Sequence, residues 1–244
     1  MRNLTSTPSP QVYARIGGLA YLIIIVAGFI GEMVIRNKLI VSGDPVATAH
    51  NIMASPLLWR IGIAGDLLMH VCDLIVAMVY YMLFRQVNKN LARLALFFGL
   101  IQTAVLVANK MNLMMPLLLL GNDDYLKAFD PQQLQAWAYL SVKAHSYGFG
   151  IGLIFFGFEC LVDGYLVVKS GFLPPVLGIM ITVAGLCYLV NSFALVISPG
   201  LADKLFPAIL APAFIGELSM CLWLLLKGIN TEKWNKLVNS SAPK

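Results

Sequence analysis

The sequence has few charged residues. Only 12% of its 244 residues are Asp, Glu, Lys or Arg, whereas 59% are hydrophobic. A soluble domain is usually about a quarter charged, so this composition, with a mean hydropathy of +0.79, indicates a membrane protein. The net charge of +5 comes with no cluster of basic and aromatic residues, which excludes an ordinary nucleic-acid-binding protein. We therefore expect the lipid bilayer to be the main partner.

The sequence also lacks cysteine pairs and recognisable catalytic motifs. The four cysteines all lie in apolar segments and none belongs to a CxxC pair. This pattern indicates buried thiols and excludes a zinc-ribbon or disulfide framework. The chain has no HExxH motif, and no internal repeat of the kind found in inverted-repeat transporters. Whether the protein is an enzyme therefore stays open, and no cofactor is indicated.

Long apolar runs are what the sequence does contain. A membrane-spanning helix needs about 20 predominantly apolar residues. Six runs of this kind occur, near residues 16–36, 60–84, 91–120, 145–168, 174–197 and 207–227. We predict an all-α bundle of six transmembrane helices in one domain, residues 1–230, followed by a cytoplasmic tail over residues 231–244. The first run exceeds a signal-peptide core of ~7–15 residues, so we expect it to stay in place as an anchor.

Two connections have patterns of their own. Apolar and polar residues alternate at helical spacing around residues 45–55, which predicts a short helix on the membrane surface in the first outer loop. Asp130 and Pro131 are typical of a helix start. A fourth helix beginning there would be about 58 Å long against a bilayer core of ~30 Å. It would project from the bilayer or break at the glycines of segment 148–152, which alternatively allow close helix packing.

The basic residues predict the orientation. With six spans, ten Lys and Arg residues fall on the side of the two termini and five fall on the opposite side. Short cytoplasmic loops are enriched in Lys and Arg. We therefore expect both termini in the cytoplasm.

Half of the twelve acidic residues lie inside the predicted spans. A charge at bilayer depth costs from ~3 to over 10 kcal/mol, so it usually faces a protein interior or a water-filled cavity. In the predicted orientation all six helices contribute polar residues to the outer half of the membrane. We predict a small-molecule or ion site there, formed by Glu32, Asp66, His70, Asp73, Asn109, Lys110, His145, Asn191 and Glu217. Glu159 and Asp163 fall in the cytoplasmic half, either on a proton path or, for Asp163, at the inner boundary.

Asp66, His70 and Asp73 are the sharpest local arrangement. Their i, i+4, i+7 spacing places the three side chains on one helix face. Together with His145, or with Glu217 in its place, they could bind a divalent metal, and such a site could activate water for hydrolysis. The alternative is a salt-bridge network in which the acids face basic residues, namely Arg60, Lys110 and Lys143.

Four stretches carry a resemblance to a known family. They are RIGIAGDLLMHVCD (60–73), HSYGFGIGLIFFGFECLVDGYLV (145–167), SGFLPPVLGIMITVAGLCYLVNSFA (170–194) and PAFIGELSMCLWLLLKGIN (212–230). Over residues 12–230 the chain resembles bacterial membrane proteins of the domain of unknown function 4386. The resemblance implies a multi-pass protein of the bacterial cytoplasmic (inner) membrane and brings no activity. Glu159 stands where the family pattern has His, which weakens any scheme that needs a second histidine on the fourth helix.

These patterns favour a transporter or sensor that binds a small molecule or ion in a polar cavity. An intramembrane metal-dependent hydrolase and a structural or assembly subunit without catalysis are the alternatives. The identity of the ligand and any homo-oligomer are left open at this point.

Overall fold

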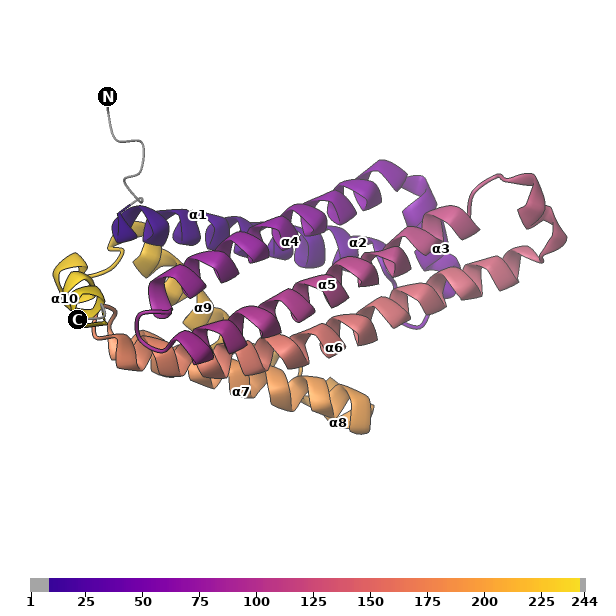
Figure 1. Ribbon diagram of the computed structural model, residues 1–244. Coiled ribbons are helices and arrows are strands. Elements are labelled where there is room, and N and C mark those ends of the chain that lie inside the picture. The colour runs from indigo at the N-terminus through magenta and orange to yellow at the C-terminus, as the bar shows by residue number, and fades with distance from the viewer. Residues whose placement is uncertain (1–8, 242–244) are drawn as a thin grey trace, which may run out of the picture.

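The computed structural model describes residues 9–241, and all regular structure in that range is helical. Six helices within it are long and apolar enough to cross a membrane (Figure 1): Pro10–Leu39, Pro56–Phe84, Lys89–Leu119, Pro131–Ser170, Pro175–Ile197 and Ala208–Leu226. The predicted all-α fold with six spanning helices is therefore confirmed. The first eight residues of the predicted domain and the last three of the predicted tail lie outside the described range.

The first span has three parts. Helix α1 (Pro10–Phe29) continues into a π-helical segment (Ile30–Arg36) and then α2 (Asn37–Leu39). The remaining elements are α3 (Pro45–Ala54), α4 (Pro56–Phe84), α5 (Lys89–Leu119), α6 (Pro131–Ser170), α7 (Pro175–Ile197), α8 (Pro199–Leu205), α9 (Ala211–Leu226) and α10 (Thr231–Ser241), with 3₁₀ turns at Asp124–Ala128 and Ala208–Leu210.

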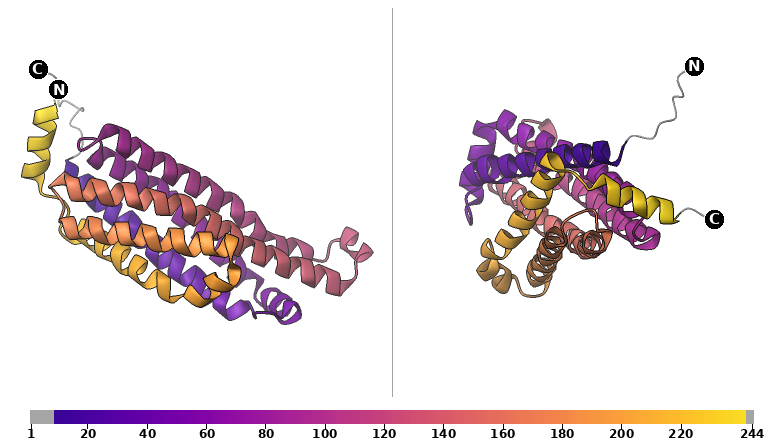
Figure 2. Two further views of the ribbon diagram at one scale, coloured as in Figure 1. Left: turned by 90° about the horizontal axis from the view of Figure 1, so that it is seen from below. Right: turned by 90° about the vertical axis from the view of Figure 1, so that its left-hand side faces the viewer.

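The six long helices form a closed ring. Each contacts the helices before and after it in the order α1, α4, α5, α6, α7 and α9, and α9 contacts α1. Short connections between antiparallel neighbours favour this order. Figure 2 shows the resulting elongated bundle, with α10 at the end where α1 begins. We call that end the terminal end and the opposite one the distal end. A ring of six helices can enclose a site in its middle.

Helix α6 runs unbroken over 40 residues. Asp130 caps its start, because the Asp130 Oδ1 atom accepts a hydrogen bond of 2.8 Å from the backbone N–H of Gln132. A helix of this length spans about 60 Å, so α5 and α6 extend beyond the other helices at the distal end (Figure 1). The start at Pro131, rather than at the predicted residue 145, follows from the capping signal.

The glycines of α6 serve close packing rather than a break. An added Cβ at Gly148 would lie 2.2 Å from the side chain of Asn109, and one at Gly152 would lie 2.5 Å from Leu106, both on α5. Small residues in membrane helices allow such close approach. Of the two sequence-based alternatives, the structure therefore shows the packing face.

Apolar side chains cover the outside of the ring. Large exposed hydrophobics occur on every long helix, for example Leu19, Leu57, Phe97, Ile179 and Ile215. Exposing such an apolar surface to water is unfavourable, whereas contact with lipid acyl chains is not. Inside, one apolar cluster near the terminal end includes Leu83, Leu166 and Met220, and a second near the distal end surrounds Trp59. Polar residues lie between these clusters.

Candidate functional site

A buried ion network lies toward the distal end. Arg36 donates to both carboxylate oxygens of Asp66, at 2.8 and 3.3 Å, and Lys110 Nζ lies 3.0 Å from Asp66 Oδ2. Arg36 also pairs with Glu32 at 2.6 Å, and only the Glu32 side chain is exposed. We call Glu32, Arg36, Asp66 and Lys110 the ion network. It joins the first span to α4 and α5 with charge-assisted hydrogen bonds.

The π-helical segment brings Arg36 into this network. Arg36 is one of the five basic residues that the orientation argument assigns to the side opposite the termini, yet the structure buries it, with 9% of its surface exposed. A π-helical turn changes the residue period and therefore the direction in which following side chains point. Arg36 is thus the functional candidate that the sequence missed. The one available signal was its i, i+4 spacing from Glu32.

The network continues to α6 through a histidine. Lys110 Nζ lies 3.4 Å from His145 Nε2, and since an ammonium group can only donate, His145 accepts. Asn109 donates a hydrogen bond of 2.8 Å to the backbone carbonyl of His145, and Asn112 donates to Asn109 at 2.9 Å. The predicted residues Asp66, Lys110, Asn109 and His145 therefore do meet.

Between the ion network and the terminal end, a cavity of about 160 Å³ lies inside the ring. Its residues come from all six long helices and include four acids, Asp73, Glu159, Asp163 and Glu217, and three phenols, Tyr21, Tyr80 and Tyr188. Gln102 and Thr103 of α5 are its other polar side chains, and the rest of the wall is apolar or aromatic apart from Cys160. All of its lining residues are described, and none of them is Lys, Arg or His. We call this space the central cavity.

Two tyrosine hydroxyls form hydrogen bonds with one of the four acids, Glu217. Tyr188 donates a short hydrogen bond to Glu217, and Tyr21 is a second hydrogen-bonding neighbour of the same carboxylate. These contacts join α1, α7 and α9 beside the cavity. Tyr80 is also nine-tenths buried, with 8% of its surface exposed, but its hydroxyl has no hydrogen-bond partner within residues 9–241. Leaving a buried hydroxyl unpaired costs free energy, which makes Tyr80 a candidate contact for a bound molecule.

Glu159 and Asp163 have no basic partner in the described part of the chain. They lie one turn apart on α6, with 8% and 5% of their surfaces exposed. Gly99 of α5 makes room for the first carboxylate, because an added Cβ there would lie 2.6 Å from Glu159 Oε1. The expectation that Asp163 reaches the inner membrane boundary is wrong, since its side chain lines the cavity.

His70 lies between the two polar groups. Its Nδ1 atom is 2.9 Å from Asp73 Oδ2, and its Nε2 atom is buried without a partner among the described residues. The predicted helix face therefore contributes to both polar groups, because Asp66 belongs to the ion network and Asp73 lines the central cavity.

The predicted single pocket divides in the structure. Of its nine residues, only Asp73 and Glu217 line the central cavity, while Glu32 is exposed at the edge of the network. Asn191 of α7 belongs to neither the ion network nor the central cavity, and its Oδ1 atom has no partner among the residues that the structure describes. The salt-bridge alternative named the wrong cations in two cases: Arg60 is exposed, and Lys143 lies over the Tyr139 ring, 5.5 Å from its centre. Arg36 takes their place beside Asp66.

The proposed metal ligands do not form a coordination set. In residues 9–241 no group of three or more His, Cys, Asp or Glu side chains has a metal-binding arrangement. Asp66 already binds two cationic side chains, and His145 faces the ammonium of Lys110. A metal at these positions would have to displace both interactions.

The ring of six apolar helices around polar groups defines a multi-pass membrane protein. Within that class, the chain belongs to the family described as a domain of unknown function, DUF4386, whose family model matches residues 16–228. An uncharacterized protein of Archaeoglobus fulgidus is 26% identical over 166 residues, which covers 68% of this chain and 83% of that relative. No solved structure matches the chain.

Proposed function

We propose that this protein binds a small organic cation in the central cavity, as a transporter or sensor of the cytoplasmic membrane. One observation carries the proposal: four carboxylates and three phenols line a cavity that contains no basic side chain. Several carboxylates cannot all be ionised in a low-dielectric site unless protons or a cation neutralise them. A bound cation would supply that charge, and an exchange of protons for the cation would keep the cavity neutral.

The walls of the cavity favour an organic cation over a metal ion. Phe149, Phe156 and the three tyrosines place aromatic rings around the acids. Ring faces attract ammonium groups, and apolar walls match the carbon atoms of an amine. A divalent metal would instead require several oxygen ligands at about 2.0–2.6 Å. The volume of about 160 Å³ is below the range of about 300–1,000 Å³ usual for drug-sized ligands, so it favours a small ligand.

The unpartnered hydroxyl of Tyr80 supports the same conclusion. This hydroxyl favours a ligand that can accept or share a hydrogen bond in the cavity, because no other residue in the described range pairs with it. A purely structural subunit would gain stability from pairing its buried polar groups, as the ion network does. The central cavity therefore favours ligand binding over the structural alternative. For the hydrolase alternative no metal-binding group occurs in the described range.

The proposed orientation keeps both termini in the cytoplasm. The positive-inside asymmetry of the short loops supports this, with the terminal end of the bundle on the cytoplasmic side. The central cavity then lies near mid-membrane and the ion network lies nearer the outer surface.

A thermal-shift titration tests the binding function. Tetramethylammonium and methylammonium chloride are added to purified protein in detergent, with sodium chloride at equal ionic strength as the reference. An occupied cavity should raise the melting temperature by roughly 5–10 °C at a hundredfold excess over Kd. Tyr80→Phe should weaken the effect a few-fold without lowering the unliganded melting temperature. Equal curves for the organic cations and sodium would rule out the proposal.

A further inference from the structure

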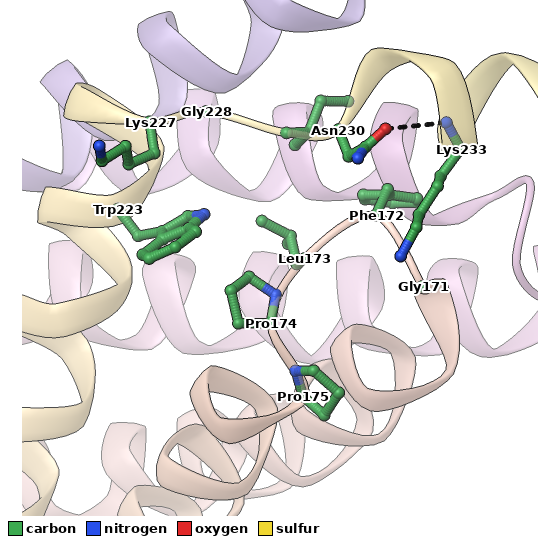
Figure 3. A pocket seen from close by; sticks show the side chains of 11 residues that line it. Gly171, Phe172, Leu173, Pro174, Pro175, Trp223, Lys227, Gly228, Asn230 and Lys233 are labelled. Carbon is green, nitrogen blue, oxygen red and sulfur yellow. Dashed lines mark hydrogen bonds between the residues drawn. The ribbon is translucent and has the colours of Figure 1, made fainter.

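A second hollow lies at the terminal end of the bundle, outside the ring. It measures about 470 Å³ and lies between the α6–α7 turn and the α9–α10 connection (Figure 3). Its lining residues are Gly171, Phe172, Leu173, Pro174, Pro175, Trp223, Lys227, Gly228, Ile229, Asn230 and Lys233. The hollow shares no residue with the central cavity.

The frame of this hollow is held by main-chain hydrogen bonds. The backbone N–H of Asn230 donates to the carbonyl of Phe172 at 2.9 Å, which ties the two connections together. Gln11 of α1 donates to the Lys227 carbonyl and accepts from the Ile229 N–H, both at 3.0 Å. Gly228 has a φ of +72°, a conformation that favours glycine. The hollow is therefore preformed by three segments of the chain.

The charge of the hollow is positive. Lys227 and Lys233 line it, and no acidic residue does. Neither amine pairs with a carboxylate in residues 9–241, whereas Lys236, outside the hollow, pairs with Glu232 at 2.7 Å. Figure 3 shows the Lys233 side chain reaching from α10 toward the Gly171–Phe172 turn, across the hollow from Trp223. The Lys227 ammonium lies at the opposite edge, beyond Trp223, so two basic side chains flank the preformed hollow and favour an anionic ligand (Figure 3).

The placement of the hollow indicates headgroup depth in the membrane. Helix α10 lies across the terminal end of the bundle (Figure 2), and its Trp234 and Leu237 side chains contact the apolar cluster of the ring. An amphipathic helix in this position is typical of the membrane interface. Trp223 supplies an amphipathic ring of the kind enriched at that depth.

We infer that this hollow binds the phosphate group of an anionic glycerophospholipid. Lys233 binds the phosphate, and Lys227 at the opposite edge adds electrostatic attraction for the anionic headgroup. Leu173, Ile229 and the Trp223 ring contact the glycerol and the start of the acyl chains. Free phosphate is also anionic but has no apolar part, whereas half of this lining is apolar. The lipid would thereby join the α6–α7 turn to the start of α10.

Native mass spectrometry of the full chain in detergent tests this site. The dissociation constants of dioleoyl-phosphatidylglycerol and dioleoyl-phosphatidylcholine are compared for the wild type and for Lys227→Gln/Lys233→Gln. Each lysine near a membrane surface contributes roughly fivefold in affinity for an anionic lipid, so the double variant should bind phosphatidylglycerol about 25-fold more weakly. Phosphatidylcholine binding should hardly change.

Two control variants keep the result interpretable. Lys236→Gln, on the same helix but outside the hollow, should bind phosphatidylglycerol like the wild type. Lys227→Arg/Lys233→Arg should retain most of the affinity because the charge is kept. Equal affinity for both lipids, or an unchanged constant in the glutamine double variant, would overturn the inference. Inorganic phosphate competing at the same concentration as the lipid would overturn the assignment to a lipid. Cation binding in the central cavity is a separate measurement, so the two proposals can fail independently.

Discussion

The ion network and the central cavity bury the same kind of side chain in opposite surroundings. Asp66 has two cationic groups within 3.0 Å. Glu159 and Asp163, on the neighbouring level of the ring, have none in the part of the chain that the structure describes. A buried carboxylate with partners ties helices together, whereas one without partners costs free energy. The comparison shows that acids inside one bundle can have different surroundings. An acid beside cations links helices, whereas an acid without a cation beside it is a candidate for ligand binding.

Removing the centre of the network should have the largest effect. Asp66→Asn leaves Arg36 and Lys110 buried without their counter-charge, which should lower stability by about 3–5 kcal/mol. The measurement is the melting temperature and the monodisperse fraction after purification in detergent. Asp163→Asn is the matched control, because it removes an acid that has no cation beside it, and it should change stability by less than about 1 kcal/mol. Equal losses in both variants would erase the distinction between the two regions.

Filling the space beside Glu159 should have the next largest effect. Gly99→Ala adds a Cβ only 2.6 Å from the carboxylate, and overpacking of this kind costs about 1–3 kcal/mol. The displaced carboxylate should also weaken tetramethylammonium binding in a thermal-shift titration. Gly65→Ala, where no atom lies within 4 Å of an added Cβ, is the control and should be tolerated. Gly99→Ala/Glu159→Ala should recover stability but not binding.

Neutralising a cavity acid should separate binding from folding. Glu159→Gln removes a carboxylate without a cation beside it, so the unliganded protein should be as stable as the wild type or more stable. Its affinity for tetramethylammonium should fall about tenfold, equivalent to ~1.4 kcal/mol. Calorimetric titration of both proteins measures this change. A variant that binds as well as the wild type would place the cation elsewhere.

The exposed edge of the network should matter least. Glu32→Gln removes a half-exposed partner of Arg36, whose bond to Asp66 stays in place. Exposed ion pairs contribute about 0–1 kcal/mol and are weakened by salt. Melting curves at low and high salt should therefore differ slightly in the wild type and not in the variant. A loss as large as that of Asp66→Asn would show that the network depends on Glu32.

Much of the fold could be predicted from residue patterns. All six spans occur where apolar runs predict them, and the helix over residues 45–55 is present as Pro45–Ala54. The fourth span begins at Pro131, as the Asp130 cap indicates, not at residue 145. The π-helical segment could not be predicted, because nothing in segment 30–36 differs in hydropathy from an ordinary helix end. Its consequence, the burial of Arg36, escaped prediction with it.

Sequence patterns indicated many of the polar side chains inside the ring, but not how those side chains group in space. The face shared by Asp66, His70 and Asp73 is correct in spacing, but its two carboxylates serve different levels of the ring. Helical period tells which side chains share a face. It does not tell how far along the bundle a neighbouring helix presents its own polar residue. Glu159 and Asp163 were placed apart from Glu217 for this reason.

By itself, then, the sequence determined a membrane protein of six helices, because apolar length and capping are local properties of the chain. Only the tertiary structure decided that the helices close into a ring, that Asp66 meets Arg36, and that four acids and three phenols share one cavity. These features depend on the rotation and axial offset of each helix against its neighbours. Packing of side chains from distant segments sets both quantities.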